Sequence, residues 1–240
     1  MEKELQDLNP DYNIFPLGDS GASFDLGNSI NLELNQKVRS MRDWLRKQPL
    51  GGIKDIIAGY SSVSLLYDPV FIKKKYALTS TVFEFIKEKL EEAWQSSPAK
   101  PTANEGELIR IPVCYDGAFG TDLDHIAQTK GLSKEEIVQY HYERNYYIYM
   151  IGFLPGFSYM AEVNKKLLMP RKINPVTVAS GSVGIAGSQT GIYPLQCPGG
   201  WQIIGRTPIK LFDSEATVPV KLTAGQWVQF YPISKEEYES

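Results

Sequence analysis

The region from Gly152 to Asp213 limits what this chain can fold into more than any other. It holds nine of the chain's twenty glycines, interspersed with aromatic residues and a few polar side chains. Glycine loses more backbone freedom on folding than other residues, so this density is tolerated where a positive φ or a close backbone approach is needed. Tight turns in a β-rich domain explain any single glycine. Because polar residues recur between the turns, the region as a whole indicates a pocket with main chain in its floor.

Composition narrows the class of protein. The 240 residues are 42% hydrophobic and 22% charged, which is ordinary for a folded chain. A net charge of −3 without a basic cluster argues against nucleic acid or an anionic membrane as partner. The acidic start, MEKELQDLNPDYN, is not a signal peptide, and no apolar run approaches the roughly 18 residues of a membrane span. Two cysteines and two histidines predict neither a disulfide framework nor a metal site, so a cytoplasmic protein is expected.

The first hundred residues predict a small α+β sandwich with one sheet and two helices on a face. Alternating patterns predict strands at 12–17, 22–26, 53–58 and 62–67. One helix is expected to begin at Ser29 or Asn31, and a second near Thr79 or Ser80. The proline-containing stretch Gln95–Glu107 is the best linker, which predicts domains at 1–100 and 101–240.

The second domain is predicted to be a closed or nearly closed β-barrel with a helix or two over its ends. Ser133 and Glu136 have the spacing of a capping box for a helix reaching about Glu143, and an earlier short helix is expected to end near Gly131. Short strands are expected at 107–114, 146–151, 176–178, 184–186, 191–193, 202–205, 210–212, 218–222 and 226–231.

The glycine-rich region contains few of the groups that catalysis needs. It has no phosphate-binding loop, dinucleotide fingerprint or G-x-S-x-G turn, and after Glu162 the next carboxylate is Asp213. What remains suits holding an anion or polarising a carbonyl, because arginine forks bind carboxylates and phosphates in two-point fashion. The candidate groups are Arg171, Arg206, Gln189, Tyr193 and backbone N–H groups.

Two alternatives stay open at this point. Each arginine alone has the simpler explanation of a surface salt bridge. His141 stands at a predicted helix C-terminus just before the strand 146–151, where either a structural role or a donor role fits. His125, among polar neighbours on the earlier helix, is expected at the surface.

Three runs of this region carry a resemblance to a known family: GFLPGFSYM, MPRK and GSVGIAGSQTGIYPLQCPGGWQIIGRTPIKLFD. They closely resemble the KipI family, also called the 5-oxoprolinase B-subunit (PxpB) family or allophanate hydrolase subunit 1. The resemblance implies a cyclophilin-like barrel after the small α+β domain, similar to barrels in the carboxyltransferase region of urea carboxylase. It also implies two partners, a C subunit of the KipA type and a lactam-utilisation A subunit. Together such subunits form a bacterial ATP-dependent 5-oxoprolinase that opens pyroglutamate to glutamate.

Carried over position by position, the family pattern implies roles for five residues. His141, Gln189 and Tyr193 are the implied catalytic residues, and Arg171 and Arg206 the implied substrate-binding residues. The chain departs from the pattern at 174–176, where members often have a second Pro-Arg, at 179–181, where they have Pro-Ala-Gly, and at Cys197, where a serine is usual. Because the chain lacks the second arginine that members often have, the charge of its ligand is an open question.

The resemblance leaves two classes of function. The first is a non-autonomous enzyme subunit, whose missing catalytic groups come from its partner. The assembled complex uses ATP, and the sequence leaves open whether this chain contacts it. The alternative is a regulatory protein that inhibits a sporulation histidine kinase, as in one branch of the family. Peptidyl-prolyl isomerase activity would follow from fold analogy alone. The apolar loop with Phe153, Leu154, Phe157 and Tyr159 is the expected contact surface for the C subunit, if it is exposed.

Overall fold

A computed structural model describes residues 11–101 and 106–240 of the chain. By its internal contacts the chain divides into two compact units, Met1–Ala103 and Asn104–Ser240. Part of the predicted linker, residues 102–105, lies outside the described residues. Residues 1–10, for which the sequence predicted that there is no signal peptide, lie outside them as well. No helix in the described ranges has the length and hydrophobicity that a membrane span requires.

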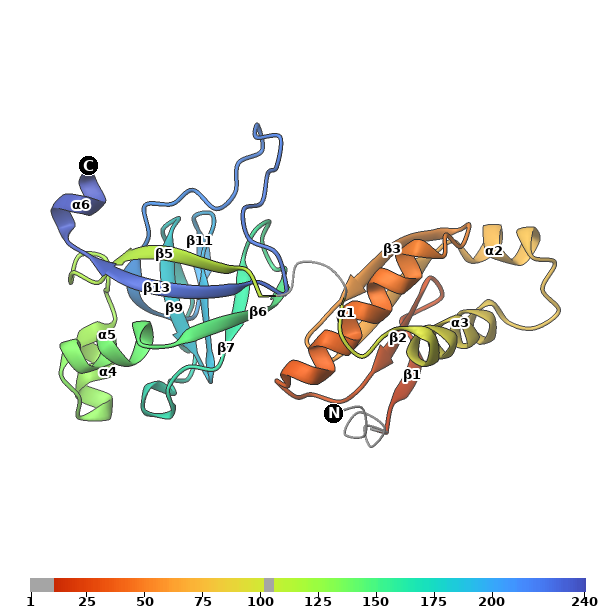
Figure 1. The fold of residues 1–240 in the computed structure, drawn as a ribbon, viewed down its shortest axis with the longest axis horizontal. Coiled ribbons are helices and arrows are strands. Elements are labelled where there is room, and N and C mark those ends of the chain that lie inside the picture. Colours follow the sequence, from red (N-terminus) through yellow and green to blue (C-terminus); the bar gives the residue numbers. More distant parts are fainter. Residues whose placement is uncertain (1–10, 102–105) are drawn as a thin grey trace. The chain divides into compact units, whose positions relative to one another are not determined.

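The N-terminal unit is an antiparallel sheet with two long helices on one face (Figure 1). The strand order is β1-β2-β4-β3. Its strands are β1 (Asn13–Pro16), β2 (Gly21–Asp25), β3 (Ile53–Ala58) and β4 (Ser62–Tyr67). Its helices are α1 (Leu32–Lys47), α2 (Pro69–Lys75) and α3 (Val82–Ser96). The predicted α+β sandwich is confirmed, because both long helices pack their apolar stripes on this sheet.

Local capping explains where these helices begin. The Asn31 side chain accepts a hydrogen bond from the backbone N–H of Leu34, so the second of the two predicted starts of α1 is confirmed. Helix α3 begins after Thr81, which forms a capping box with Glu84, one residue beyond the predicted start. Helix α2 was not predicted. Its Asp68 caps a helix whose first residue is Pro69, a position where proline is favoured because the missing N–H has no partner within the helix.

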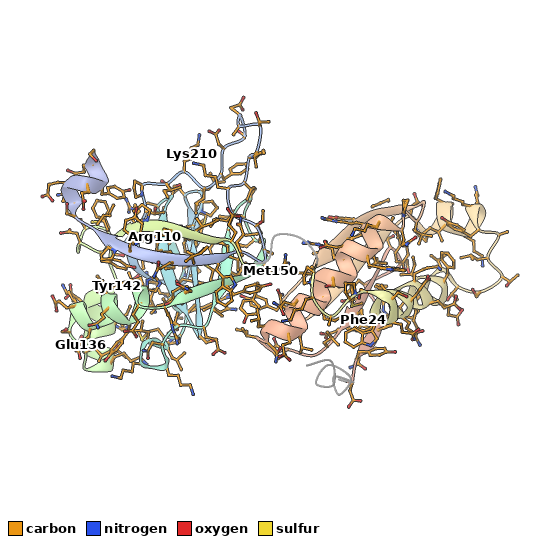
Figure 2. All side chains as sticks on the ribbon, viewed as in Figure 1. Phe24, Arg110, Glu136, Tyr142, Met150 and Lys210 are labelled. Atoms are coloured by element: carbon orange, nitrogen blue, oxygen red, sulfur yellow. The ribbon has the colours of Figure 1, made fainter. Side chains whose placement is uncertain are left out.

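The C-terminal unit is built on a closed barrel, ordered β10-β7-β6-β13-β5-β12-β9 within the described residues (Figure 1). The barrel strands are β5 (Leu108–Cys114), β6 (Asn145–Ile151), β7 (Ser158–Ala161), β9 (Ser182–Ala186), β10 (Gln189–Ile192), β12 (Gln202–Arg206) and β13 (Trp227–Ile233). The pairing of β13 with β5 is parallel and the other pairs are antiparallel. Inward side chains fill the interior as one hydrophobic core (Figure 2). The predicted barrel is confirmed.

Short elements cover the barrel. They are α4 (Leu123–Lys130), α5 (Lys134–Tyr142), the 3-10 turn η1 (Lys165–Leu167), α6 (Lys235–Glu239) and a separate pair of strands, β8 (Val176–Val178) and β11 (Cys197–Gly199). Gly131, at φ 65°, ends α4 in the left-handed region, and Ser133 and Glu136 form the predicted capping box of α5. Strands β7 and β11 and helix α6 were not predicted.

Two predicted strands are wrong. Residues 210–212 and 218–222 meet only at a single bridge, between Phe212 and Val220. Pro219 lies within the second run and has no N–H to donate, so a continuous ladder does not form there.

Candidate functional site

A pocket of about 270 Å³ lies on the part of the C-terminal unit built by the glycine-rich region. Its walls combine aromatic rings with two cations, and we call it the aromatic pocket. It is lined by Phe153, Phe157, Tyr159, Arg171, Lys172, Pro175, Tyr193, Pro198, Gly199, Gly200 and Trp201. These residues come from β7 and the loop before it, the loop after Met169, the segment from β10 to β11, and the turn into β12. The prediction that this region forms a pocket is therefore confirmed.

Five aromatic residues line the aromatic pocket, and the Phe157 ring lies at the centre of their contacts. The Phe157 ring is buried and meets Tyr193 at 5.0 Å and 80° and Trp201 at 5.4 Å and 86° between centroids and planes. Edge-to-face contacts of this kind add roughly 0.5–1.5 kcal/mol each beyond the burial of area. Phe153 extends this cluster outward, with its ring 5.8 Å from Phe157 and 65% of its surface exposed.

Two glycines explain why the rings fit. A Cβ on Gly199 would lie 2.7 Å from the Tyr193 hydroxyl oxygen and 2.8 Å from a Val178 methyl group. A Cβ on Gly191 would lie 2.8 Å from the Ser158 carbonyl oxygen and close to two of the rings. The need at these positions is close approach between backbone and rings, which is one of the two explanations that the glycine density suggested.

The cations of the pocket differ in their partners. The Lys172 ammonium is 2.6 Å from an Asp122 carboxylate oxygen, and both side chains are mostly buried. Asp122 also accepts a hydrogen bond from the backbone N–H of Ile203, so this pair ties the loop to β12. Arg171 is exposed and has no carboxylate partner among the residues that the structure describes. Its guanidinium is therefore available to an anionic ligand.

Tyr193 is a hydrogen-bond donor at neutral pH. Burial raises the pKa of its hydroxyl to about 12, and the effect is partly offset by a hydrogen bond from the Trp201 backbone and by the nearby charge of Arg171. Because the hydroxyl oxygen accepts that backbone bond, its own proton remains for another acceptor. A neutral donor beside an unpaired guanidinium suits a small carboxylate or a polarised carbonyl.

His141 lies outside the aromatic pocket. It is fully buried on α5, and its ring stacks on Phe230 at 4.6 Å. Its Nδ1 is 2.8 Å from the Tyr115 hydroxyl and its Nε2 2.9 Å from the Thr190 hydroxyl. Since Thr190 donates to the Gly184 carbonyl, Nε2 carries the proton and Nδ1 accepts from Tyr115. Burial lowers the His141 pKa to about 3, so the ring is neutral. This arrangement favours the structural alternative, and the catalytic role stays a prediction.

The two other predicted residues are also outside the aromatic pocket. Gln189 is the first residue of β10, half-buried, and pairs with Ala186 and Ala161 on the neighbouring strands. Arg206 ends β12 with its guanidinium 5.3 Å from the Phe119 ring centre. The structure thus brings Arg171 and Tyr193 together in one pocket, while His141, Gln189 and Arg206 do not line it.

Sequence reasoning missed three contributors to the site. Trp201 forms part of the wall, and the Lys172–Asp122 pair holds the loop that carries Arg171. The partners of this pair lie far apart in the sequence, so no local pattern connects them. The spacing of Phe157 and Tyr159, two residues apart in a strand pattern, was a usable signal for one aromatic face.

Comparison with known proteins identifies the family. The chain matches the family model "Carboxyltransferase domain, subdomain C and D" over residues 12–222. It is 38% identical over 231 residues to the B subunit of 5-oxoprolinase from Bacillus subtilis (strain 168), covering 95% of this chain and 96% of the relative. The chain belongs to the 5-oxoprolinase B-subunit family. The resemblance carried by the glycine-rich motifs is confirmed.

Two other relatives of this B-subunit family member are longer. The solved structure of TTHA0988 superposes with a TM-score of 0.75 at 31% identity, covering 89% of this chain and 40% of that chain. The urea amidolyase of Saccharomyces cerevisiae (strain ATCC 204508 / S288c) is 24% identical over 268 residues, covering 100% of this chain and 14% of the relative. The match thus spans about two fifths of the first protein and a seventh of the second, where the matched region is one part of a longer polypeptide.

Within residues 11–101 and 106–240, no three His, Cys, Asp or Glu side chains lie together as metal ligands would. Among the residues that the structure describes, Arg171 is the one unpaired cation that lines the aromatic pocket. The pocket is smaller than the roughly 300–1,000 Å³ of pockets for drug-sized ligands. Its residues fit a small carboxylate and do not fit a nucleoside triphosphate, whose phosphates need several cations or a backbone cradle.

Proposed function

We propose that this chain is the B subunit of an ATP-dependent 5-oxoprolinase, which opens pyroglutamate to glutamate. It acts together with the A and C subunits, which are of the lactam-utilisation and KipA types. The observation that carries the proposal is 38% identity, over nearly the full length of both chains, to a protein named as the B subunit of 5-oxoprolinase. The aromatic pocket supports it, because 5-oxoproline is a small ring that carries one carboxylate.

In this proposal the aromatic pocket contributes to the substrate site. The Arg171 guanidinium binds the carboxylate, and the lactam ring lies against the aromatic wall. The Tyr193 hydroxyl donates to an oxygen of the substrate, since its pKa of about 12 keeps it protonated at neutral pH. Where the acceptor of this hydrogen bond is the lactam carbonyl oxygen, Tyr193 also polarises the carbonyl group. His141, Gln189 and Arg206 remain proposed site residues whose roles need testing by substitution.

In this proposal, partner subunits supply the groups that the aromatic pocket does not offer. Opening a lactam at the expense of ATP needs a phosphate-binding site and acid–base groups. The aromatic pocket suits neither role, because among the described residues Arg171 is its one available cation and Tyr193 stays protonated. We therefore assign ATP binding and the remaining catalytic groups to the A and C subunits, and expect no 5-oxoprolinase activity from this chain alone.

The test is reconstitution with the A and C subunits from the same genome. We expect glutamate formation that requires ATP, 5-oxoproline and all three subunits. Arg171→Ala is expected to raise the apparent KM for 5-oxoproline roughly ten- to a hundredfold, because a charged hydrogen bond contributes about 1.5–3 kcal/mol. The matched control is Arg110→Ala, an exposed arginine on β5 that does not line the pocket.

Three results would contradict the proposal. Activity of the isolated chain would show that it holds the complete catalytic set. An unchanged KM for Arg171→Ala in an active complex would remove the pocket from substrate binding while leaving the chain's place in the complex intact. Absence of activity in the assembled complex, with inhibition of a histidine kinase by the isolated chain, would favour the regulatory alternative.

A further inference from the structure

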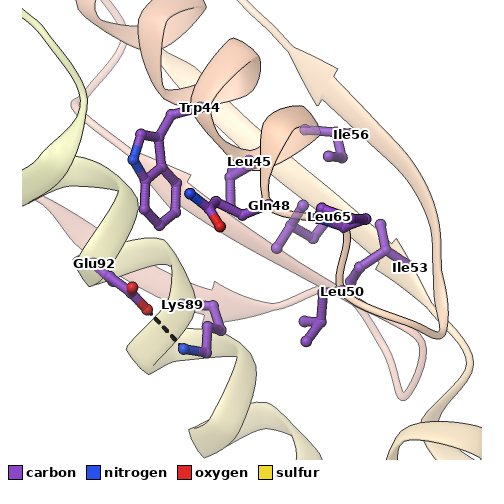
Figure 3. A pocket seen from close by; sticks show the side chains of 10 residues that line it. Trp44, Leu45, Gln48, Leu50, Ile53, Ile56, Leu65, Lys89 and Glu92 are labelled. Atoms are coloured by element: carbon purple, nitrogen blue, oxygen red, sulfur yellow. Dashed lines mark hydrogen bonds and ion pairs between the residues drawn. The ribbon is translucent and has the colours of Figure 1, made fainter.

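A second pocket, of about 240 Å³, lies within the N-terminal unit, and we call it the helix pocket. It opens between the C-terminal half of α1 and the middle of α3, over strands β3 and β4 (Figure 3). It is lined by Trp44, Leu45, Gln48, Pro49, Leu50, Ile53, Ile56, Leu65, Lys89 and Glu92. The function proposed above does not use this pocket.

The floor and most of the walls of the helix pocket are apolar. Leu45 and Leu65 are buried, and Leu50, Ile53 and Ile56 are partly buried against the same core. Helix α3 directs Ile86, Leu90 and Ala93 into that core, but the turn facing α1 at this level carries Lys89 and Glu92. Polar side chains therefore stand where a further apolar side chain would have closed the space between the helices.

The mouth of the helix pocket carries one charge of each sign. The Lys89 ammonium and a Glu92 carboxylate oxygen are 2.6 Å apart, drawn as a dashed line in Figure 3. The two side chains are 36% and 48% exposed, and exposed pairs of this kind contribute little to stability. A ligand can therefore bind both Lys89 and Glu92 in place of their mutual ion pair with little loss of folding stability. Gln48, at the end of α1, adds an amide on the opposite side of the opening.

An apolar cavity with a paired cation and anion at its mouth complements one class of small molecule. We propose that the helix pocket binds a free α-amino acid with a branched or aromatic apolar side chain. The ligand's carboxylate bonds to the Lys89 ammonium, its ammonium bonds to the Glu92 carboxylate, and its side chain lies on the Leu50, Ile53 and Leu65 surface. A small ligand of this kind suits the volume, which is below that of drug-sized pockets.

The test is an NMR titration of the full chain labelled with ¹⁵N, which follows the indole N–H signals of its tryptophans. Leucine and phenylalanine are added up to about 10 mM, a range that covers millimolar dissociation constants. Trp44 lines the helix pocket, and Trp201 lines the aromatic pocket and reports on binding there. Trp44→Phe assigns the first signal. We expect saturable shifts of the Trp44 signal with an unshifted Trp201 signal.

Half-probes separate the contributions of the ligand's groups. 4-Methylpentanoate lacks the ammonium, 3-methylbutylamine lacks the carboxylate, and glycine lacks the side chain. Each is expected to bind at least tenfold more weakly than leucine, because each loses one charged hydrogen bond or the apolar contact. Equal binding of leucine and 4-methylpentanoate would overturn the amino-acid assignment.

Substitutions in the ion pair complete the test. Lys89→Met and Glu92→Gln are each expected to weaken leucine binding at least tenfold, since each removes one charged partner. The matched controls are Lys87→Met and Glu91→Gln, an exposed ion pair on the same helix that does not line the pocket. All four side chains are exposed or half-exposed, so the thermal midpoint should hardly move. No saturable binding by any probe, or equal effects of both pairs of substitutions, would overturn the proposal.

Discussion

His141 shows how burial decides what a single side chain does. In water an imidazole takes up a proton near neutral pH, which made this histidine a candidate donor. In the barrel it is a neutral link in a chain of hydrogen bonds that runs from the Tyr115 hydroxyl through Thr190 to the Gly184 carbonyl. Every hydrogen-bonding group of the ring is satisfied in that state, and a second ring proton would have to displace the Tyr115 hydroxyl hydrogen.

The first prediction concerns the pH dependence of stability. The His141 pKa is about 3 in the folded state and about 6.5 when unfolded, so between these values the unfolded chain binds a proton that the folded chain does not. The contribution to stability is therefore complete above pH 6.5 and falls as the pH drops toward 3. Between pH 7.5 and 5.5 the free energy of unfolding should fall by about 1.4 kcal/mol on this account.

Urea unfolding of the full chain at both pH values measures this fall. His141→Gln should remove it, whatever that substitution costs at pH 7.5. His125→Gln is the control, because His125 is exposed on α4 and should leave the fall unchanged. A fall of equal size in all three proteins would show that other groups cause it.

At the scale of elements, close packing between strands and rings explains the glycine-rich region. Strand β11 approaches the Tyr193 ring so closely at Gly199 that a methyl group has no room. The turn into β12 then places Trp201 against Phe157. The aromatic pocket is therefore shaped by backbone as well as by side chains.

The second prediction follows from that packing. In Gly199→Ala the new methyl group would lie 2.7 Å from the Tyr193 hydroxyl oxygen, so the ring or β11 must shift. Overpacking of this kind costs about 1–3 kcal/mol of the free energy of unfolding, measured by urea titration. Gly117→Ala is the control, because nothing lies within 4 Å of its added methyl group. Equal stabilities of the two variants would contradict the close approach.

The third prediction concerns the helix that carries His141. Ser133→Ala removes the hydroxyl that accepts from the Glu136 N–H and should cost about 1 kcal/mol of the free energy of unfolding. Ser234→Ala breaks the same kind of capping box on α6, which buries none of its residues. Because α6 can fray without opening the core, this second substitution should have little effect on the same urea transition. A larger loss from Ser234→Ala would contradict the expectation.

On the scale of the whole molecule, the two units have separate cores and separate pockets. The N-terminal core lies between α1, α3 and the four-stranded sheet, and the other core fills the barrel. The aromatic pocket and the helix pocket each belong to one unit. Binding of the C subunit through one unit and of a small ligand through the other would therefore use different surfaces.

The fourth prediction assigns the contact with the C subunit to the barrel unit and rests on the proposed function. Phe153 is 65% exposed beside the aromatic pocket, and exposed aromatic residues often anchor interfaces. Phe153→Ser should weaken capture of the C subunit more than tenfold, in a binding titration with purified proteins. The control is Phe71→Ser on α2 of the N-terminal unit, where Phe71 is 48% exposed.

If Phe153→Ser leaves capture of the C subunit unchanged and Phe71→Ser abolishes it, the contact lies on the N-terminal unit instead. A fragment of residues 1–100 that captured the C subunit with the affinity of the full chain would give the same answer. Of the loop predicted to form this contact, Phe157 is buried, so Phe153 is the aromatic residue with most surface to offer.

Much of the fold was predictable from local sequence, because local chemistry determines it. Asn31, Gly131 and the pair Ser133 and Glu136 begin or end their helices by bonds within a few residues. Alternating apolar residues predicted the four-stranded sheet and the barrel except for β7, and the glycine density of 152–205 predicted a pocket. The predicted strands at 210–212 and 218–222 failed, since alternation takes no account of Pro219, which has no N–H to extend the ladder beyond the bridge between Phe212 and Val220.

The tertiary structure alone decided which side chains meet. Arg171 and Tyr193 share a pocket because β11 and the loop after Met169 lie beside the same rings, and Asp122 holds that loop through Lys172. His141, equally promising in the sequence, ends inside the core because α5 packs against β13 and β10. Residue types and short spacings determine caps, strands and turns, whereas the contacts between distant segments depend on how the barrel closes. Contacts of this kind have no local signature, and this is why the sequence offered Arg171 and Tyr193 as candidates but only the fold showed that they share one pocket.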